Sequence, residues 1–151
     1  HPLQTNFAAI NGTVGSLVID DAGNLYAGGS FASAGGENAS NIARWNGESW
    51  DTLGAGLNGR VQSLATDGTS VYVAGAFSMA GNTAAKALAR WDGTTWHQVG
   101  GGVTGSIYGL AVHGSNLFIA GALSLAGTTP VNDVARWNGT SWAGLGSGMT
   151  G

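Results

Sequence analysis

The stretch ARWNGESW at residues 43–50 returns as ARWDGTTW at 89–96 and as ARWNGTSW at 135–142. Each copy begins 46 residues after the one before it. Self-similarity at a fixed step of this length indicates a repeat architecture, in which every repeat is one supersecondary unit. The sequence therefore predicts a chain built from three structural units of the same kind.

The same step divides the whole chain of 151 residues. The glycines that close the units, Gly59, Gly105 and Gly151, are also 46 residues apart. Because a chain of this length suits one domain better than two, we expect a single domain over residues 1–151. The first residue is His1 rather than Met, so we expect a processed chain or a fragment of a longer one. The predicted divisions are a lead at 1–12 and units at 13–59, 60–105 and 106–151.

Four short strands are predicted in each unit. In the middle unit, segments rich in β-branched, aromatic and small apolar residues predict strands at 61–65, 71–77, 87–91 and 96–99. A polar loop of small residues is expected at 80–86. No stretch has the apolar period of a helix, so we expect few helices.

A turn is predicted between the last two strands of each unit. It is marked by Asn46-Gly47, by Asp92-Gly93 and by Asn138-Gly139. Such pairs suit a two-residue type I′ hairpin, because both central residues of that turn have positive φ.

The size of the unit indicates the fold class. Four strands in 46 residues lie between WD-type repeats of about 40–45 residues and kelch-type repeats of about 50. Repeats of this kind form the blades of β-propellers. Glycine makes up 28 of the 151 residues, and small residues let sheets that are buried on both faces approach closely. We therefore predict an all-β fold, a β-propeller with three four-stranded blades in each chain.

The residues also resemble a known kind of repeat. Leu-Tyr-x-x-Gly-x-Phe-x-x-Ala-Gly at 25–35, followed by Ala-Arg-Trp-Asn-Gly-x-x-Trp-x-x-Leu-Gly-x-Gly at 43–56, resembles the propeller repeats of many secreted bacterial proteins. It is also similar to the propeller of fungal cortical bud-site markers and, more distantly, to kelch and galactose-oxidase-like blades. The resemblance implies a propeller fold and a secreted or cell-surface location. It implies no particular activity, because the fold hosts many.

Composition excludes several classes of partner. Charged residues are 9% of the chain, the net charge is −3, and only five residues are Lys or Arg. This argues against binding to nucleic acid or to an anionic membrane surface. No apolar run approaches the roughly 20 residues that span a bilayer, so no membrane insertion is expected. The chain has no cysteine, which excludes disulfides and thiolate chemistry.

The repeated arginines Arg44, Arg90 and Arg136 have two interpretations. A ring of arginines could hold an anionic ligand. Alternatively, each guanidinium satisfies backbone groups within the architecture, and we favour this because the residue recurs in every unit. No acidic residue repeats at a fixed distance from these arginines, so we expect carbonyl or amide partners.

The paired tryptophans that flank each turn are the candidate ligand-binding residues. We expect the two rings of a pair to meet across the hairpin and the first ring to serve packing. The second ring of each pair is a candidate for stacking on a sugar: Trp50, Trp96 and Trp142.

No catalytic or metal constellation is evident. His97 and His113 are isolated in the sequence, and no nucleophile elbow or phosphate-binding loop is present. We predict no catalytic residue, no metal site and no cofactor.

Three functional hypotheses follow. The first is a non-enzymatic extracellular propeller that serves as an interaction or adhesion scaffold. The second is a lectin that binds glycans at repeated pockets between blades. The third is an enzyme with its site in the central channel, for which only eight acidic residues, five basic residues and three histidines are available. We favour the first.

Assembly is the last expectation. Closed propellers typically have four to eight blades, and three blades leave two unpaired faces. Two copies give six blades, so we predict a homodimer that forms a six-bladed ring with head-to-tail contacts. Residues 3–7 of the lead occupy the place of a fourth strand and are expected to pair at the seam. The unpaired faces are predicted to be lined by residues such as Leu17, Tyr26, Leu117 and Phe118.

Overall fold

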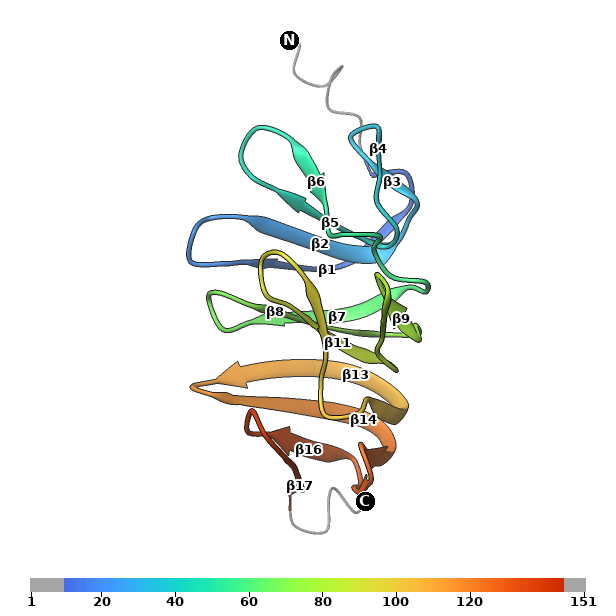
Figure 1. The fold of residues 1–151 in the computed structure, drawn as a ribbon, viewed down its shortest axis with the longest axis vertical. Helices are drawn as coiled ribbons and strands as arrows, with labels where there is room; N and C mark the ends of the chain where they lie inside the picture. The colour runs from blue at the N-terminus through green and yellow to red at the C-terminus, as the bar shows by residue number, and fades with distance from the viewer. Residues whose placement is uncertain (1–9, 146–151) are drawn as a thin grey trace.

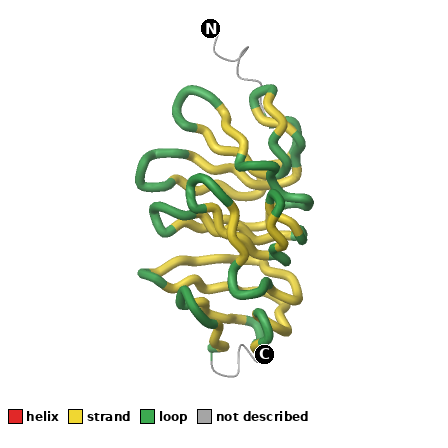
Figure 2. Tube along the Cα trace, viewed as in Figure 1, coloured by secondary structure: helices red, strands yellow, loops and turns green. Residues whose placement is uncertain are grey.

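The computed structural model describes residues 10–145. These residues form strands joined by turns and loops, and none of them is helical (Figure 2). The prediction of an all-β fold is confirmed. The expected pairing of residues 3–7 at a seam lies outside the described residues. The strands are β1 (Thr13–Ile19), β2 (Leu25–Ser30), β3 (Ser33–Ala34), β4 (Glu37–Asn38), β5 (Ile42–Trp45), β6 (Trp50–Thr52), β7 (Val61–Thr66), β8 (Val71–Gly75), β9 (Met79–Ala80), β10 (Thr83–Ala84), β11 (Leu88–Trp91), β12 (Trp96–Gln98), β13 (Val103–His113), β14 (Asn116–Ala126), β15 (Thr129–Pro130), β16 (Val134–Trp137) and β17 (Trp142–Gly144).

Three larger antiparallel sheets carry the architecture. The first has the order β1-β2-β5-β6, the second β7-β8-β11-β12 and the third β13-β14-β16-β17, with β15 also paired to β14. The sheets follow one another along the long axis of the molecule, in the order of the sequence (Figure 1). Each sheet is built from the strands of one repeat, except that β13 begins at Val103, within the second unit.

The first strands of the three sheets lie against one another. β7 contacts β1 on one side and β13 on the other. Two apolar clusters fill the space between the sheets. One joins the first and second sheets and includes Tyr26, Ile42, Val61 and Leu64. The other joins the second and third sheets and includes Leu88, Ile107, Leu117 and Ile119. Burial of apolar surface between sheets is thus the main force that holds the units together.

The predicted two-residue type I′ turns are wrong. Trp91 pairs directly with Trp96, which leaves a four-residue connection. Only Gly93 in this connection has a positive φ, of 105°. The carboxylate of Asp92 accepts hydrogen bonds from the backbone amides of Thr94 and Thr95, at 2.9 and 2.8 Å. An Asp or Asn side chain that closes a turn in this way does not itself need positive φ. Asn46 and Asn138 close the equivalent turns in the same manner.

The loop predicted at 80–86 also contains short strands. β9 and β10 form a two-stranded ribbon in the second unit, and β3 and β4 form its counterpart in the first. The carboxamide oxygen of Asn58 accepts hydrogen bonds from the amides of Ser78 and Met79, at 2.9 and 3.0 Å, where this ribbon begins. Asn11 binds the amides of residues 32 and 33 in the first unit.

A glycine repeated in the second strand lets that strand pass close to the first. A Cβ atom on Gly75 would overlap the carbonyl oxygen of Arg60, where β7 carries a bulge. Gly29 and Gly121 meet the equivalent carbonyl oxygens in the other two sheets. The sheets therefore require glycine at this position, since any side chain would force β7 and its counterparts outward.

The prediction of which residues line the outer faces of the stack is only partly correct. Leu17 is 57% exposed, as expected of an unpaired face. Tyr26 and Leu117 are each only 1% exposed, so their assignment to the unpaired faces is wrong. Both lie on sheet faces that pack against the second sheet, where they belong to the two apolar clusters.

Candidate functional site

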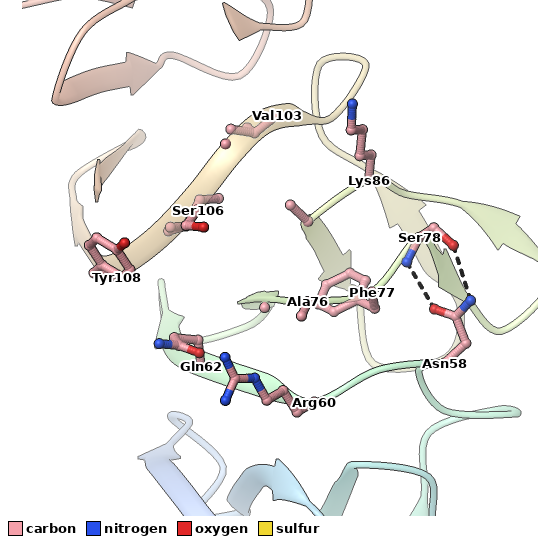
Figure 3. Close-up of a pocket in the computed structure, with 14 residues that line it drawn as sticks. Asn58, Arg60, Gln62, Ala76, Phe77, Ser78, Lys86, Val103, Ser106 and Tyr108 are labelled. Atoms are coloured by element: carbon pink, nitrogen blue, oxygen red, sulfur yellow. Dashed lines mark hydrogen bonds between the residues drawn. The ribbon is translucent and has the colours of Figure 1, made fainter. Parts of the chain in front are cut away.

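A groove of about 460 Å³ opens between the second and third sheets. One wall comes from β7 and from the segment that follows β8, and the opposite wall comes from β13. Figure 3 shows Gln62 and Arg60 on one wall and Tyr108 on the other, toward the same end of the groove. Lys86 and Asn58 lie toward the other end.

Another groove, of about 260 Å³, lies between the first and second sheets. Its walls are formed by Thr13 and Gly15 of β1, by Arg60, which directly precedes β7, and by Gln62 of β7. The registers Val14–Gly29, Val61–Gly75 and Ile107–Gly121 show that these positions are equivalent in the three sheets. The two grooves are therefore the same architectural feature, repeated one sheet apart. We call them the first groove (between the first and second sheets) and the second groove (between the second and third sheets).

The polar groups of the second groove are not all used by the fold. The Asn58 carboxamide is held by Ser78, since its nitrogen donates to the Ser78 hydroxyl at 3.0 Å (Figure 3). The Lys86 ammonium donates to the Thr104 hydroxyl at 3.2 Å. Within residues 10–145, neither the Arg60 guanidinium nor the Gln62 carboxamide has a hydrogen-bond partner. Tyr108 is 62% exposed. The groove thus presents a guanidinium, a carboxamide and a phenol to a ligand.

The predicted ligand-binding tryptophans lie away from these grooves. Trp96 is 7% exposed, and its indole nitrogen donates to the carbonyl of Leu53 in the preceding sheet, at 2.8 Å. The Trp142 indole nitrogen likewise donates to a carbonyl that follows the preceding sheet, that of Gly100, at 3.2 Å. Trp50 is half-buried and packs against Gly35. These bonds give Trp96 and Trp142 a role between units, and sugar binding by the second tryptophan of each pair stays a prediction.

The tryptophans of each pair do meet across the hairpin, as expected. The ring centroids are 5.4 Å apart for Trp45 and Trp50, and 5.1 Å apart for Trp91 and Trp96. The third pair, Trp137 and Trp142, has a separation of 5.2 Å. The tilted geometry of all three is one that aromatic pairs prefer.

The repeated arginines lie on the third strand of each sheet and do not converge on one site. The prediction that they bind carbonyl or amide groups is wrong for Arg44 and Arg90, and the buried Nε atom of Arg136 has no hydrogen-bond partner within residues 10–145. Arg44 forms an ion pair with Asp51 at 3.3 Å, because Asp51 lies directly opposite on β6. Arg90 donates to the Ser70 hydroxyl at 3.1 Å, because His97 occupies the position of Asp51 in its sheet.

A second ion pair in the described part of the chain joins an aspartate and a histidine. Asp92 and His97 approach to 2.7 Å in the turn of the second sheet. Hydrogen bonds from the amide of Thr95, from the His97 ring and from the amide of Thr94 hold the pKa of Asp92 well below its ordinary value.

Among residues 10–145, no three His, Asp or Glu side chains gather as a metal site would require. No helix in the same range could cross a membrane.

The residues of the grooves were missed by the sequence reasoning, which looked for what the repeats share. The groove positions are those at which the repeats differ. Thr13, Arg60 and Ser106 are equivalent, and so are Gly15, Gln62 and Tyr108. A comparison of the units for their differences would have singled out Arg60 and Tyr108.

Comparison with known proteins adds no assignment: neither the protein-family models nor the curated proteins include a match to this chain.

Proposed function

We propose that the chain is a non-enzymatic binding scaffold of the kelch-like β-propeller type, which acts outside the cell or at the cell surface. The observation that supports this proposal is the pair of equivalent grooves between successive sheets, the larger of which presents unpaired polar groups. A repeated groove on a rigid stack of sheets suits recognition, because binding sites concentrate where elements meet around a preformed cavity.

The propeller is completed, in this proposal, by a second copy of the chain. The face of the first sheet that points away from the second sheet exposes Val14 (40%) and Leu17 (57%). Their counterparts in the second sheet, Val61 and Leu64, are only 4% and 6% exposed, because the first sheet covers them. Val14 and Leu17 are thus apolar residues at positions that an adjacent sheet covers in the second sheet. In a single chain, no sheet covers them.

The far face of the third sheet offers the matching half of this contact. Ala120 is exposed, whereas its counterparts Gly28 and Ala74 are buried beneath the next sheet. Leu145 is 40% exposed, whereas Leu53, its counterpart in the first sheet, is fully buried. A head-to-tail contact between the third sheet of one copy and the first sheet of another therefore continues the interface already present inside the chain. Two copies give a ring of six sheets, within the usual range for propellers.

The test is the mass of the particle in solution, measured by multi-angle light scattering. We expect a single species with twice the mass of the 15.0 kDa chain. A monodisperse species with the mass of one chain and a cooperative melt would contradict the assembly. A mass of three chains would replace the six-bladed ring with a nine-bladed one.

A lectin is the second candidate, because equivalent grooves recur and lectins use repeated sites. A glycan array with the folded chain tests it. Binding to a defined class of saccharide supports the lectin, and an array without any signal removes it.

A further inference from the structure

We propose that the second groove binds the carboxylate or sulfate group of an acidic saccharide, and that Arg60 makes the principal contact. This specifies the ligand class of the scaffold proposed above and rests on that proposal. It does not depend on the assembly, because both walls of the groove belong to one chain.

Positive charge is distributed unevenly over the chain. Of the five cationic residues, the three repeated arginines lie on the third strands of the sheets, and Arg44 among them is paired with Asp51. The other two, Arg60 and Lys86, both line the second groove. No acidic residue is among the residues that line it. In a chain of net charge −3, this groove therefore concentrates the available positive charge, and an anion is the ligand that it favours.

The geometry of Arg60 suits an oxyanion. Its guanidinium is exposed, and it lacks a hydrogen-bond partner anywhere in residues 10–145. The planar fork of a guanidinium binds carboxylate or sulfate oxygens through two parallel hydrogen bonds. Because no group within residues 10–145 binds the Arg60 guanidinium, a ligand gains these bonds without breaking others.

The neighbouring groups suit a sugar rather than a small inorganic ion. A groove of about 460 Å³ accommodates a small organic ligand. Gln62 offers both a donor and an acceptor to ring hydroxyls. Tyr108, on the opposite wall and 62% exposed, presents an aromatic face and a hydroxyl. Arg60 also lines the first groove. In that groove, however, Thr13 and Gly15 hold the positions that Arg60 and Gln62 hold in the second groove, and no tyrosine is among the lining residues.

Isothermal titration calorimetry on the intact chain tests the proposal. The probes are tetragalacturonate, sulfated maltotetraose, neutral maltotetraose and inorganic sulfate. We expect binding of at least one acidic tetrasaccharide, weakening with added salt, and no measurable binding of the neutral one. Arg60→Gln should weaken this binding roughly tenfold or more, as expected for the loss of charge-assisted hydrogen bonds. Tyr108→Ala should weaken it while leaving the circular dichroism spectrum unchanged.

Gln98→Glu is the matched control, because it changes the net charge by the same amount at an exposed site on β12. It should bind like the wild type. Preference for tetragalacturonate identifies a carboxylate ligand, and preference for the sulfated sugar identifies a sulfate ligand. Equal binding of inorganic sulfate overturns the assignment to a saccharide.

Two results would overturn the proposal altogether. One is wild-type affinity in Arg60→Gln, which would place the ligand elsewhere. The other is the absence of binding to either acidic tetrasaccharide; if light scattering still shows two chains in the particle, the scaffold stands and only its ligand class is wrong.

Discussion

Gly75 lies where β8 passes the bulge of β7, and a Cβ atom there would overlap the carbonyl oxygen of Arg60. We expect Gly75→Ala to lower the free energy of unfolding by about 2 kcal/mol, since overpacking forces backbone shifts. Gly109→Ala is the control, because a Cβ atom at Gly109 on β13 would meet no atom within 4 Å. Urea unfolding of both variants checks this. Equal losses in the two variants would show that close approach is not the reason for the glycine.

Asp92 confers sensitivity to acid. Its pKa in the folded chain lies below the ordinary value of 3.8, first because of the hydrogen bond from the Thr95 amide and then because of His97. As the pH falls below about 4, the unfolded chain takes up a proton that the folded chain does not, so stability falls. Asp92→Asn should keep the turn, as Asn46 and Asn138 do, and lose less stability on acidification. Thermal melts across this pH range measure it; an acid response like that of the wild type would exclude Asp92 as a cause.

At the scale of the strand pair, substitutions of Trp91 and Trp96 distinguish the contribution of packing from that of hydrogen bonding. Both belong to the same hairpin and are nearly buried, at 5% and 7% exposure. The Trp96 indole donates to Leu53 in the preceding sheet, whereas the Trp91 indole has no hydrogen-bond partner in residues 10–145. Replacing each by Phe removes similar apolar area. We expect Trp96→Phe to cost about 1 kcal/mol more than Trp91→Phe, because it removes the bond to Leu53, whose carbonyl then keeps only the hydrogen bond from the Gly56 amide.

Chemical denaturation of the two variants gives this difference directly. Trp142→Phe should resemble Trp96→Phe, because the Trp142 indole also donates to a backbone carbonyl, that of Gly100. If Trp91→Phe proves the more damaging, the bond between sheets contributes less than the packing within the hairpin.

At the scale of the whole molecule, a substitution at Leu17 tests the proposed ring of two chains. Leu17→Glu changes a side chain that is 57% exposed in a single chain, so the monomer should fold as before. In the proposed ring the same residue lies between two chains, where an unpaired charge is costly. We therefore expect the variant to have the mass of one chain by light scattering, and its melting temperature to be independent of protein concentration. Leu125→Glu, at an exposed leucine of the β14–β15 pair, should leave the wild-type mass unchanged. A Leu17→Glu protein that keeps the wild-type mass would place the contact elsewhere.

The repeat, the all-β class and the main strands of the sheets could be predicted from the amino-acid sequence alone. The strand predicted at 61–65 is β7 at Val61–Thr66, and the one predicted at 87–91 is β11 at Leu88–Trp91. Residue preference and alternation act over a few neighbours, and three repeats present the same signal three times. The pairing of each tryptophan with the next could be predicted for the same reason, because both belong to one hairpin.

The grooves and the partners of the arginines could not be predicted in this way, because they depend on how the sheets pack. Arg60 and Tyr108 are far apart in the sequence and face one groove because β7 packs against β13. Arg44 has a carboxylate partner because Asp51 happens to lie opposite it, although no acid repeats in the other units. Contacts of this kind depend on how whole sheets pack, and the burial that drives the packing is non-directional. A local sequence pattern therefore specifies that sheets will stack, while the stacked geometry selects which polar side chains meet between them.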